Sequence, residues 1–138
     1  MISKYKFFSY FFIGLVCLVI LQFVSFILSK KEIFIYKNDK LLFFFSPPYI
    51  IIILFLVLII FILFSLYEIK KEKDIPYINI PLGLILGGGL SNIFDRIRIG
   101  AVADYLDLYF WKMNLADIFI FIGILILFYQ FIKSKKNT

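Results

Sequence analysis

The stretch from Gly87 to Gly123, GGGLSNIFDRIRIGAVADYLDLYFWKMNLADIFIFIG, decides the fold of this chain. Both of its ends are apolar and continue into runs long enough to cross a membrane. Carboxylates this close to hydrocarbon are costly, so they are usually there for a function. Four of the nine acidic residues of the chain fall within the stretch: Asp95, Asp104, Asp107 and Asp117.

The composition is too apolar for a soluble domain. The 138 residues are 63% hydrophobic with a mean hydropathy of +1.01, whereas about half apolar is typical of soluble domains. Cys17 is the single cysteine and the chain has no histidine, so neither an internal disulfide nor a Cys/His metal cluster is available. The formal charge of +6 is dispersed along loops and ends, which favours contact with lipid headgroups over nucleic-acid binding.

Apolar runs of about 20 residues predict an all-α membrane protein with four transmembrane helices in one domain, residues 1–138. The first run is too long for a signal peptide and lacks a small-residue cleavage site, so we expect it to stay as an anchor. Pro81 should kink the third helix or mark its early turns. The expected spans are residues 7–28, 49–67, 75–97 and 114–132.

An even number of spans places both termini on one side of the membrane. Basic residues near the termini and at Lys70–Lys73 place that side in the cytoplasm. On the outer side we expect a small β-hairpin or cradle between the first two helices, with strands at Glu32–Tyr36 and Leu41–Phe45 and a turn at Lys37–Lys40. An irregular aromatic loop in the interface is the alternative.

The third span carries a small face and then a polar face. Gly83, Gly87 and Ser91 recur every fourth residue, which permits close approach of another helix. Asn92, Asp95 and Arg96 then share one face at the end of the helix. The guanidinium of Arg96 could pair with Asp95 or grip a carbonyl or headgroup in a bidentate way. A purely structural ion pair at the helix end is the alternative.

The fourth span begins with an amide and an acid at i and i+3. Asn114 suits an N-cap, and Asp117 then lies in the first turn, where the helix dipole favours its charged form and burial opposes it. Asp104 follows the turn-permitting Gly100, so a short re-entrant or surface element could carry it over the mouth of the bundle. We expect Asp107 to lie on a solvated face.

Two carboxyl groups can hydrolyse an amide without a metal or a histidine. Close carboxyls share one proton because both cannot ionise side by side. The ionised member then draws a proton from water while the protonated member donates to the scissile carbonyl. The residues therefore predict a membrane-embedded aspartyl peptidase that uses Asp104 and Asp117.

Three blocks in the C-terminal part of the chain together resemble the signature of lipoprotein signal peptidase, the type II signal peptidase of bacteria. Four spans with an outer hairpin between the first two also agree with the architecture of that family. The blocks are Asn92-x-x-Asp95-Arg96, Gly100-x-Val102-x-Asp104-Tyr105, and Trp111 followed by Asn114-x-Ala116-Asp117.

The resemblance implies an endopeptidase that removes the signal peptide of a prolipoprotein just before a cysteine carrying diacylglycerol. Asp104 and Asp117 match the catalytic aspartates of the family. It also implies no cofactor, a multi-pass location in the bacterial cytoplasmic membrane with the site at the extracytoplasmic face, and inhibition by the cyclic peptide globomycin. We expect a monomer whose partners are the substrate and membrane lipids. The residues that match the supporting and substrate-holding positions are Asn92, Asp95, Arg96 and Asn114.

The first half departs from the family. Its first span usually carries an acid-Gln pair and a nearby Lys, where this chain has Leu21-Gln22 and Ser25. The family block N-x-G-x-A-F is present only as residues 38–43 (NDKLLF), without the Gly or the Ala. These differences leave open a divergent specificity or a paralogue with reduced activity. Two other classes stay open from the residues alone: a small proton- or ion-coupled transporter subunit, and an assembly protein that uses the small-residue face.

Overall fold

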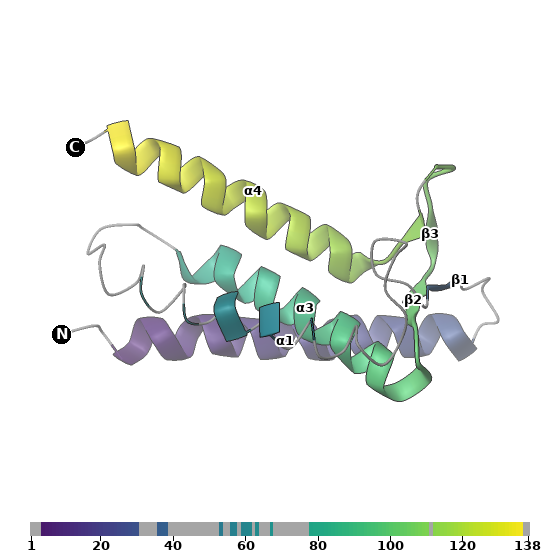
Figure 1. The fold of residues 1–138 in the computed structure, drawn as a ribbon. Coiled ribbons are helices and arrows are strands. Elements are labelled where there is room, and N and C mark those ends of the chain that lie inside the picture. Colours follow the sequence, from purple (N-terminus) through teal and green to yellow (C-terminus); the bar gives the residue numbers. More distant parts are fainter. Residues whose placement is uncertain are drawn as a thin grey trace.

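The computed structural model describes residues 4–30, 36–38, 53, 56–57, 59–61, 63, 67, 78–110 and 112–136. Within these residues the chain is mostly helical, and the short strands gather at one end of the helices (Figure 1). The elements, in chain order, are α1 (Lys4–Lys30), β1 (Tyr36–Asn38), α3 (Asn79–Ile99), β2 (Val102–Asp104), β3 (Leu106–Asp107), β4 (Lys112–Met113) and α4 (Leu115–Lys136).

Helix α1 is long and apolar enough to cross a membrane. Its apolar core runs from Phe8 to Leu28 with a mean hydropathy of 2.8, and it alone among the described helices meets both conditions. The apolar part of α4, Leu115–Gln130, is shorter. Large apolar side chains on the outer faces of both helices are exposed, for example Phe12 at 67% and Phe128 at 65%, a pattern that suits lipid contact.

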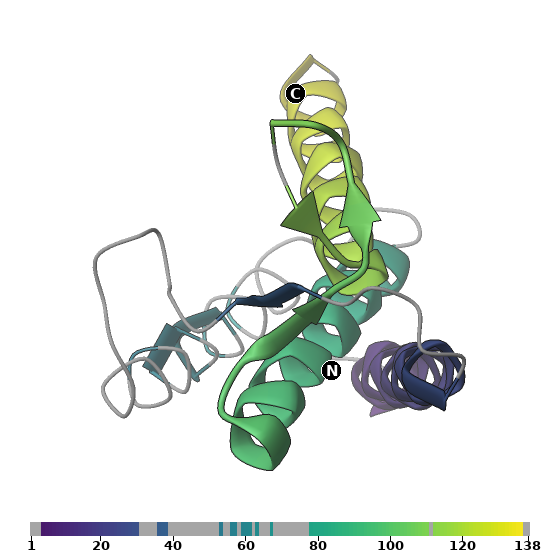
Figure 2. The same ribbon diagram turned by 90° about the vertical axis from the view of Figure 1, so that its right-hand side faces the viewer.

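Helix α3 packs against both α1 and α4, as Figures 1 and 2 show. Its small residues make this possible, because Gly87 lies directly against Gly14 and Cys17 of α1, and Gly88 against Ala116 of α4. The expected close-approach face is therefore confirmed. A buried cluster of Tyr10, Ile78, Leu82 and Leu86 fills the space between α1 and the start of α3.

Two small antiparallel sheets lie at the end of the bundle. Strand β1 pairs with β2, with Tyr36 opposite Asp104 and Asn38 opposite Val102. Strands β3 and β4 form a hairpin with Leu106 opposite Met113. The turn expected at residues 37–40 is wrong at Lys37 and Asn38, because these two residues belong to β1 and pair with β2.

The expected helix limits hold for three of the four spans to within a few residues. Helix α1 extends beyond 7–28 at both ends, α3 begins at Asn79 rather than near 75, and α4 continues to Lys136. Pro81 is buried in the first turn of α3, where proline is tolerated. The span expected at 49–67 lies outside the described residues except for isolated helical positions, and the strand expected at 41–45 lies outside them entirely.

Candidate active site

A reciprocal pair of hydrogen bonds closes the start of α4. The Oδ1 atom of Asn114 accepts a hydrogen bond from the backbone N–H of Asp117 at 3.0 Å. The Oδ2 atom of Asp117 accepts one from the backbone N–H of Asn114 at 3.2 Å. This is a capping-box arrangement, so the expected N-cap is confirmed. It also holds the Asp117 carboxylate at the mouth of the bundle.

The side-chain amides of Asn114 and Asn92 together connect the carboxyl groups of two different elements. The Nδ2 of Asn114 donates to Oδ1 of Asp104 at 3.3 Å and to Oδ1 of Asn92 at 3.0 Å. Asn92 in turn donates from Nδ2 to Oδ1 of Asp117 at 2.8 Å. Asp104 on β2 and Asp117 on α4 therefore lie around the same pair of amides. Asp104 and Asn114 are both only 3% exposed.

Strand β2 is what carries Asp104 to this place. Helix α3 ends at Gly100, which adopts a left-handed conformation with φ of 73° and whose N–H donates to the carbonyl of Arg96. Glycine has no steric penalty there. The chain turns back at once into β2, which is buried throughout. The short re-entrant or surface element expected around Asp104 is therefore a strand, and it is buried and not on the surface.

Asp95 ties three elements together. Its Oδ1 accepts a hydrogen bond from Nε2 of Gln22 on α1 at 3.1 Å, and its Oδ2 accepts one from the N–H of Ala103 on β2 at 3.4 Å. Its ion pair is with Arg98 at 3.6 Å. Among the described residues, Asp95 forms its ion pair with Arg98 and not with Arg96, the partner considered from the sequence. Asp95 thus fixes β2 one residue before Asp104.

Arg96 is buried with part of its guanidinium unsatisfied. It is 9% exposed, and its Nη1 donates to the carbonyl of Asn92 at 3.3 Å. Its Nε has no hydrogen-bond partner within the described part of the chain. An unsatisfied buried donor is expensive, so this atom is a candidate to bind a carbonyl oxygen that enters the site.

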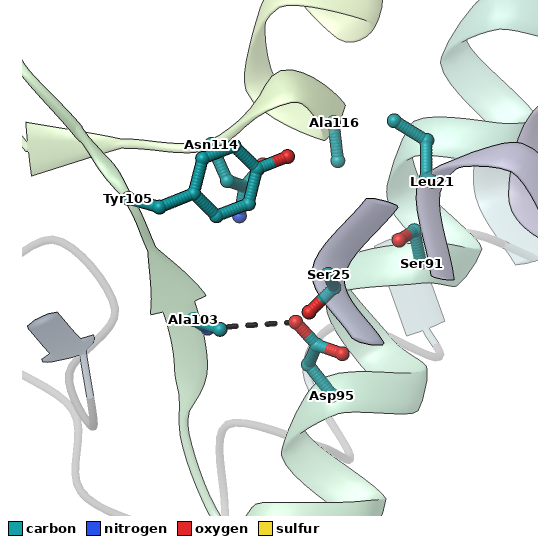
Figure 3. A pocket seen from close by; sticks show the side chains of 8 residues that line it. All are labelled: Leu21, Ser25, Ser91, Asp95, Ala103, Tyr105, Asn114 and Ala116. Atoms are coloured by element: carbon teal, nitrogen blue, oxygen red, sulfur yellow. Dashed lines mark hydrogen bonds between the residues drawn. The ribbon is translucent and has the colours of Figure 1, made fainter. Parts of the chain in front are cut away.

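A small cleft opens beside these residues (Figure 3). Tyr105 lies on one wall, and its hydroxyl accepts a hydrogen bond from the N–H of Leu115 at 3.1 Å. Burial raises the pKa of the Tyr105 phenol, the Leu115 N–H opposes this, and the nearby carboxylates raise it further. The lining residues are Leu21 and Ser25 of α1, Ser91 and Asp95 of α3, Ala103, Tyr105, Asn114 and Ala116.

Of the residues predicted from sequence, the structure brings Asn92, Asp104, Asn114 and Asp117 into one hydrogen-bonded group. Asp95 and Arg96 adjoin this group. Asp107 is exposed, as expected, and its Oδ1 accepts a hydrogen bond from the N–H of Tyr109. Trp111 lies outside the described residues.

Sequence reasoning missed the contributions of Gln22 and Tyr105. Gln22 donates to both Oγ and the carbonyl oxygen of Ser91 as well as to Asp95. An amide within an otherwise apolar span was the available signal, because such a group needs partners in another helix. Tyr105 stood in one of the signature blocks, but its contact with α4 depends on which way its ring points, and the block does not show that.

The fold and the site define a small helical membrane protein in which two carboxylates accept hydrogen bonds from a pair of asparagines at one end of the bundle. The chain matches the model of the signal peptidase (SPase) II family over residues 32–133 and belongs to that family. Two solved structures, each described as a bacterial membrane enzyme, share this fold with TM-scores of 0.74 and 0.75 at 19% identity. They cover 94% and 96% of this chain, and 91% and 98% of theirs.

Curated relatives match the chain over part of its length. A lipoprotein signal peptidase of Wigglesworthia glossinidia brevipalpis is 43% identical over 76 residues, which cover 51% of this chain and 50% of that protein. A lipoprotein signal peptidase of Moorella thermoacetica is 48% identical over 58 residues, which cover 41% and 39%. The chain thus spans half or less of the length of these relatives.

Proposed function

We propose that this protein is a membrane-embedded aspartyl endopeptidase that removes signal peptides from prolipoproteins whose cysteine carries diacylglycerol. The observation that carries the proposal is Asn114, whose side-chain Nδ2 donates to the carboxylate of Asp104 and whose backbone N–H donates to that of Asp117. Membership of the signal peptidase II family and relatives named lipoprotein signal peptidase support the substrate class.

The proposed chemistry needs one proton shared by two carboxyl groups. One carboxylate takes a proton from water as the water oxygen bonds to the scissile carbonyl carbon. The protonated carboxyl gives its proton to the carbonyl oxygen. The intermediate then collapses: a hydroxyl returns its proton to that carboxylate, the C–N bond breaks, and the leaving amine takes the proton first drawn from water. Asp104 and Asp117 take these two roles.

The surrounding polar groups would orient the carboxyls and the substrate. Asn92 and Asn114 hold the oxygens of the pair at 2.8 to 3.3 Å. The Nε of Arg96, which has no hydrogen-bond partner among the described residues, would donate to a substrate carbonyl. Asp95 would act indirectly, because it holds the backbone of Ala103, the residue before Asp104. Fixed donors around a reacting centre are worth more in a water-poor site than in bulk solvent.

We further propose four membrane spans in the bacterial cytoplasmic membrane, with both termini in the cytoplasm and the carboxylate pair at the extracytoplasmic face. The start of α1 and the end of α4 lie at the same end of the bundle, opposite the strands (Figure 1). The exposed apolar surfaces of α1 and α4 support this placement. The clustering of Asp95, Asp104 and Asp117 at one end also favours a peptidase over a proton relay, which would need acids spread through the membrane depth.

The test is processing of a diacylglyceryl-modified prolipoprotein by purified protein in detergent or liposomes, followed by gel shift. Asp104→Asn and Asp117→Asn should each reduce the rate by at least about 100-fold while accumulating normally in membranes. Globomycin should block the wild-type reaction. Full processing by both single variants would refute the assignment, and proton flux through liposomes that needs Asp117 would favour a transporter instead.

A further inference from the structure

We propose that the hydroxyl of Tyr105 donates a hydrogen bond to a carbonyl oxygen of the peptide substrate, as a contact of the active site in addition to the two carboxyl groups. This inference rests on the proposed function and adds a substrate-binding group to it. Tyr105 directly follows Asp104 in the chain.

The hydroxyl of Tyr105 is held in place by the start of α4. Leu115 is the first residue of that helix, so its N–H has no acceptor within the helix. It donates to Oη of Tyr105 at 3.1 Å. The ring spans from the end of β2 to α4, and its hydroxyl points into the cleft toward Ala116 and α1 (Figure 3). The phenol is therefore oriented before any substrate arrives.

The proton of this hydroxyl is still available. A phenol can accept hydrogen bonds and donate one, and the Leu115 N–H occupies only the accepting side. Within the part of the chain that the structure describes, Tyr105 donates to no acceptor. Its O–H lies in a cleft shared with Asn114 and bordered by the carboxylate group described above.

The charges around the cleft select the kind of acceptor. The titratable groups that act on the phenol are Asp95 from α3, Asp104 from β2 and Asp117 from α4. The α1 residues that line the cleft, Leu21 and Ser25, carry no charge. Three acidic groups outnumber the one guanidinium that interacts with all of them, that of Arg96, so they disfavour an anionic ligand much more strongly than a neutral carbonyl. The backbone carbonyls of an extended signal peptide fit this requirement.

The same surroundings keep the phenol protonated. Burial and the three carboxyl groups raise the pKa of Tyr105 above its usual value of about 10. The hydroxyl can donate only while it holds its proton. Donation is therefore complete at neutral pH and is lost only as the pH rises through this elevated pKa.

Replacing Tyr105 with a series of fluorinated tyrosines of decreasing phenol pKa tests the donor role. A phenolate still accepts the Leu115 N–H, so the contact between β2 and α4 is kept while donation is lost. Once the phenol pKa lies below the pH range of the assay, we expect the maximal kcat/KM of the pH profile to fall about tenfold. This is the effect of one lost hydrogen bond in the transition state. The same series at Tyr109, which is 92% exposed, is the matched control and should leave the profile unchanged.

The alternatives give different results. If Tyr105 only accepts a hydrogen bond, the series keeps full kcat/KM and the proposal is overturned. If the phenolate acts only through its charge, the pH profile of kcat/KM shifts along the pH axis while its maximum stays the same. That result would also overturn the proposal. A failure of the unmodified protein to process any prolipoprotein would overturn the proposed function itself, and this inference with it. Tyr105→Phe should show the tenfold loss together with a loss of stability, because it removes both the proposed donor to the substrate and the acceptor for the Leu115 N–H.

Discussion

The packing interface between α1 and α3 and the polar end of the bundle use opposite kinds of side chain. The interface consists of atoms in close contact: a Cβ placed on Gly83 would lie 2.5 Å from Cγ2 of Ile13, and one on Gly87 would lie 2.5 Å from Cβ of Cys17. The polar end is held by hydrogen bonds between buried groups from several elements. Atoms cannot be added to the first region, and donors cannot be removed from the second.

The difference follows from what stabilises each region. Between helices in lipid there is little hydrophobic driving force, so close backbone approach has to supply the attraction. At the end of the bundle, buried carboxylates need donors because an unpaired buried charge is costly. Substitutions at the interface should therefore change stability, and substitutions at the polar end should change activity.

Apart from the two carboxyl groups themselves, the largest effect is expected at Asn114. Asn114→Ala removes the donor to Asp104 and Asn92, so the reacting carboxyl groups lose their relative placement and kcat should fall by about 100-fold. The variant also loses the N-cap, at a cost of about 1 kcal/mol. Processing assays and thermal unfolding in detergent measure the two effects.

Asn114→Asp separates these two roles. Aspartate is as good an N-cap as asparagine, but it has no NH₂ group and adds a charge beside Asp104. We expect the helix cap to be kept, stability to fall because the added charge is buried beside Asp104, and activity to be as low as in Asn114→Ala. Recovered activity in the aspartate variant would mean that the cap, and not the donor, is what the site requires.

At the interface the sensitive position is Gly87. Gly87→Ala should destabilise the protein by about 1 to 3 kcal/mol, the usual cost of overpacking, because the new methyl group would also lie 2.7 Å from the carbonyl of Gly14. Gly89→Ala is the matched control, since a Cβ there meets nothing within 4 Å. It should be neutral or stabilising by up to about 1 kcal/mol. Equal stability of the two variants in detergent unfolding would contradict the close contact.

Gln22 connects the α1–α3 interface with the polar end of the bundle, so its substitution should affect both stability and activity. It lies on α1 and donates to Ser91 and Asp95 of α3. Gln22→Leu should cost about 0.6 to 2 kcal/mol of stability, the range for hydrogen bonds between membrane helices, and should lower activity severalfold, because Asp95 then holds β2 less firmly. Gln22→Glu, which keeps the shape but not the donor, should not restore activity. Wild-type processing by Gln22→Leu would mean that Asp95 needs no support from α1.

Regular patterns in the sequence predicted the parts of this structure that local physics decides. The apolar runs predicted four helices, of which three, α1, α3 and α4, are described by the structure. The spacing of Gly83 and Gly87 predicted the close packing, and Asn114 with Asp117 predicted the helix cap. The partners of Asp95 and the pairing of β1 with β2 were not predictable in the same way. Both depend on which of several chemically equivalent partners the fold brings near, as the choice of Arg98 over Arg96 illustrates.

The smallest effect is expected at Asp107, three residues after Asp104 in a chemically similar stretch. Asp107 is exposed in the β3–β4 hairpin, and its carboxylate accepts a hydrogen bond from the N–H of Tyr109 at 2.9 Å. That bond supports the positive φ of 72° at Tyr109, and asparagine can make it equally well. Asp107→Asn should therefore change neither kcat nor stability beyond about 0.5 kcal/mol, whereas Asp104→Asn should be inactive. If Asp107→Asn were the inactive variant, the burial and amide contacts that distinguish Asp104 would not determine which carboxyl reacts.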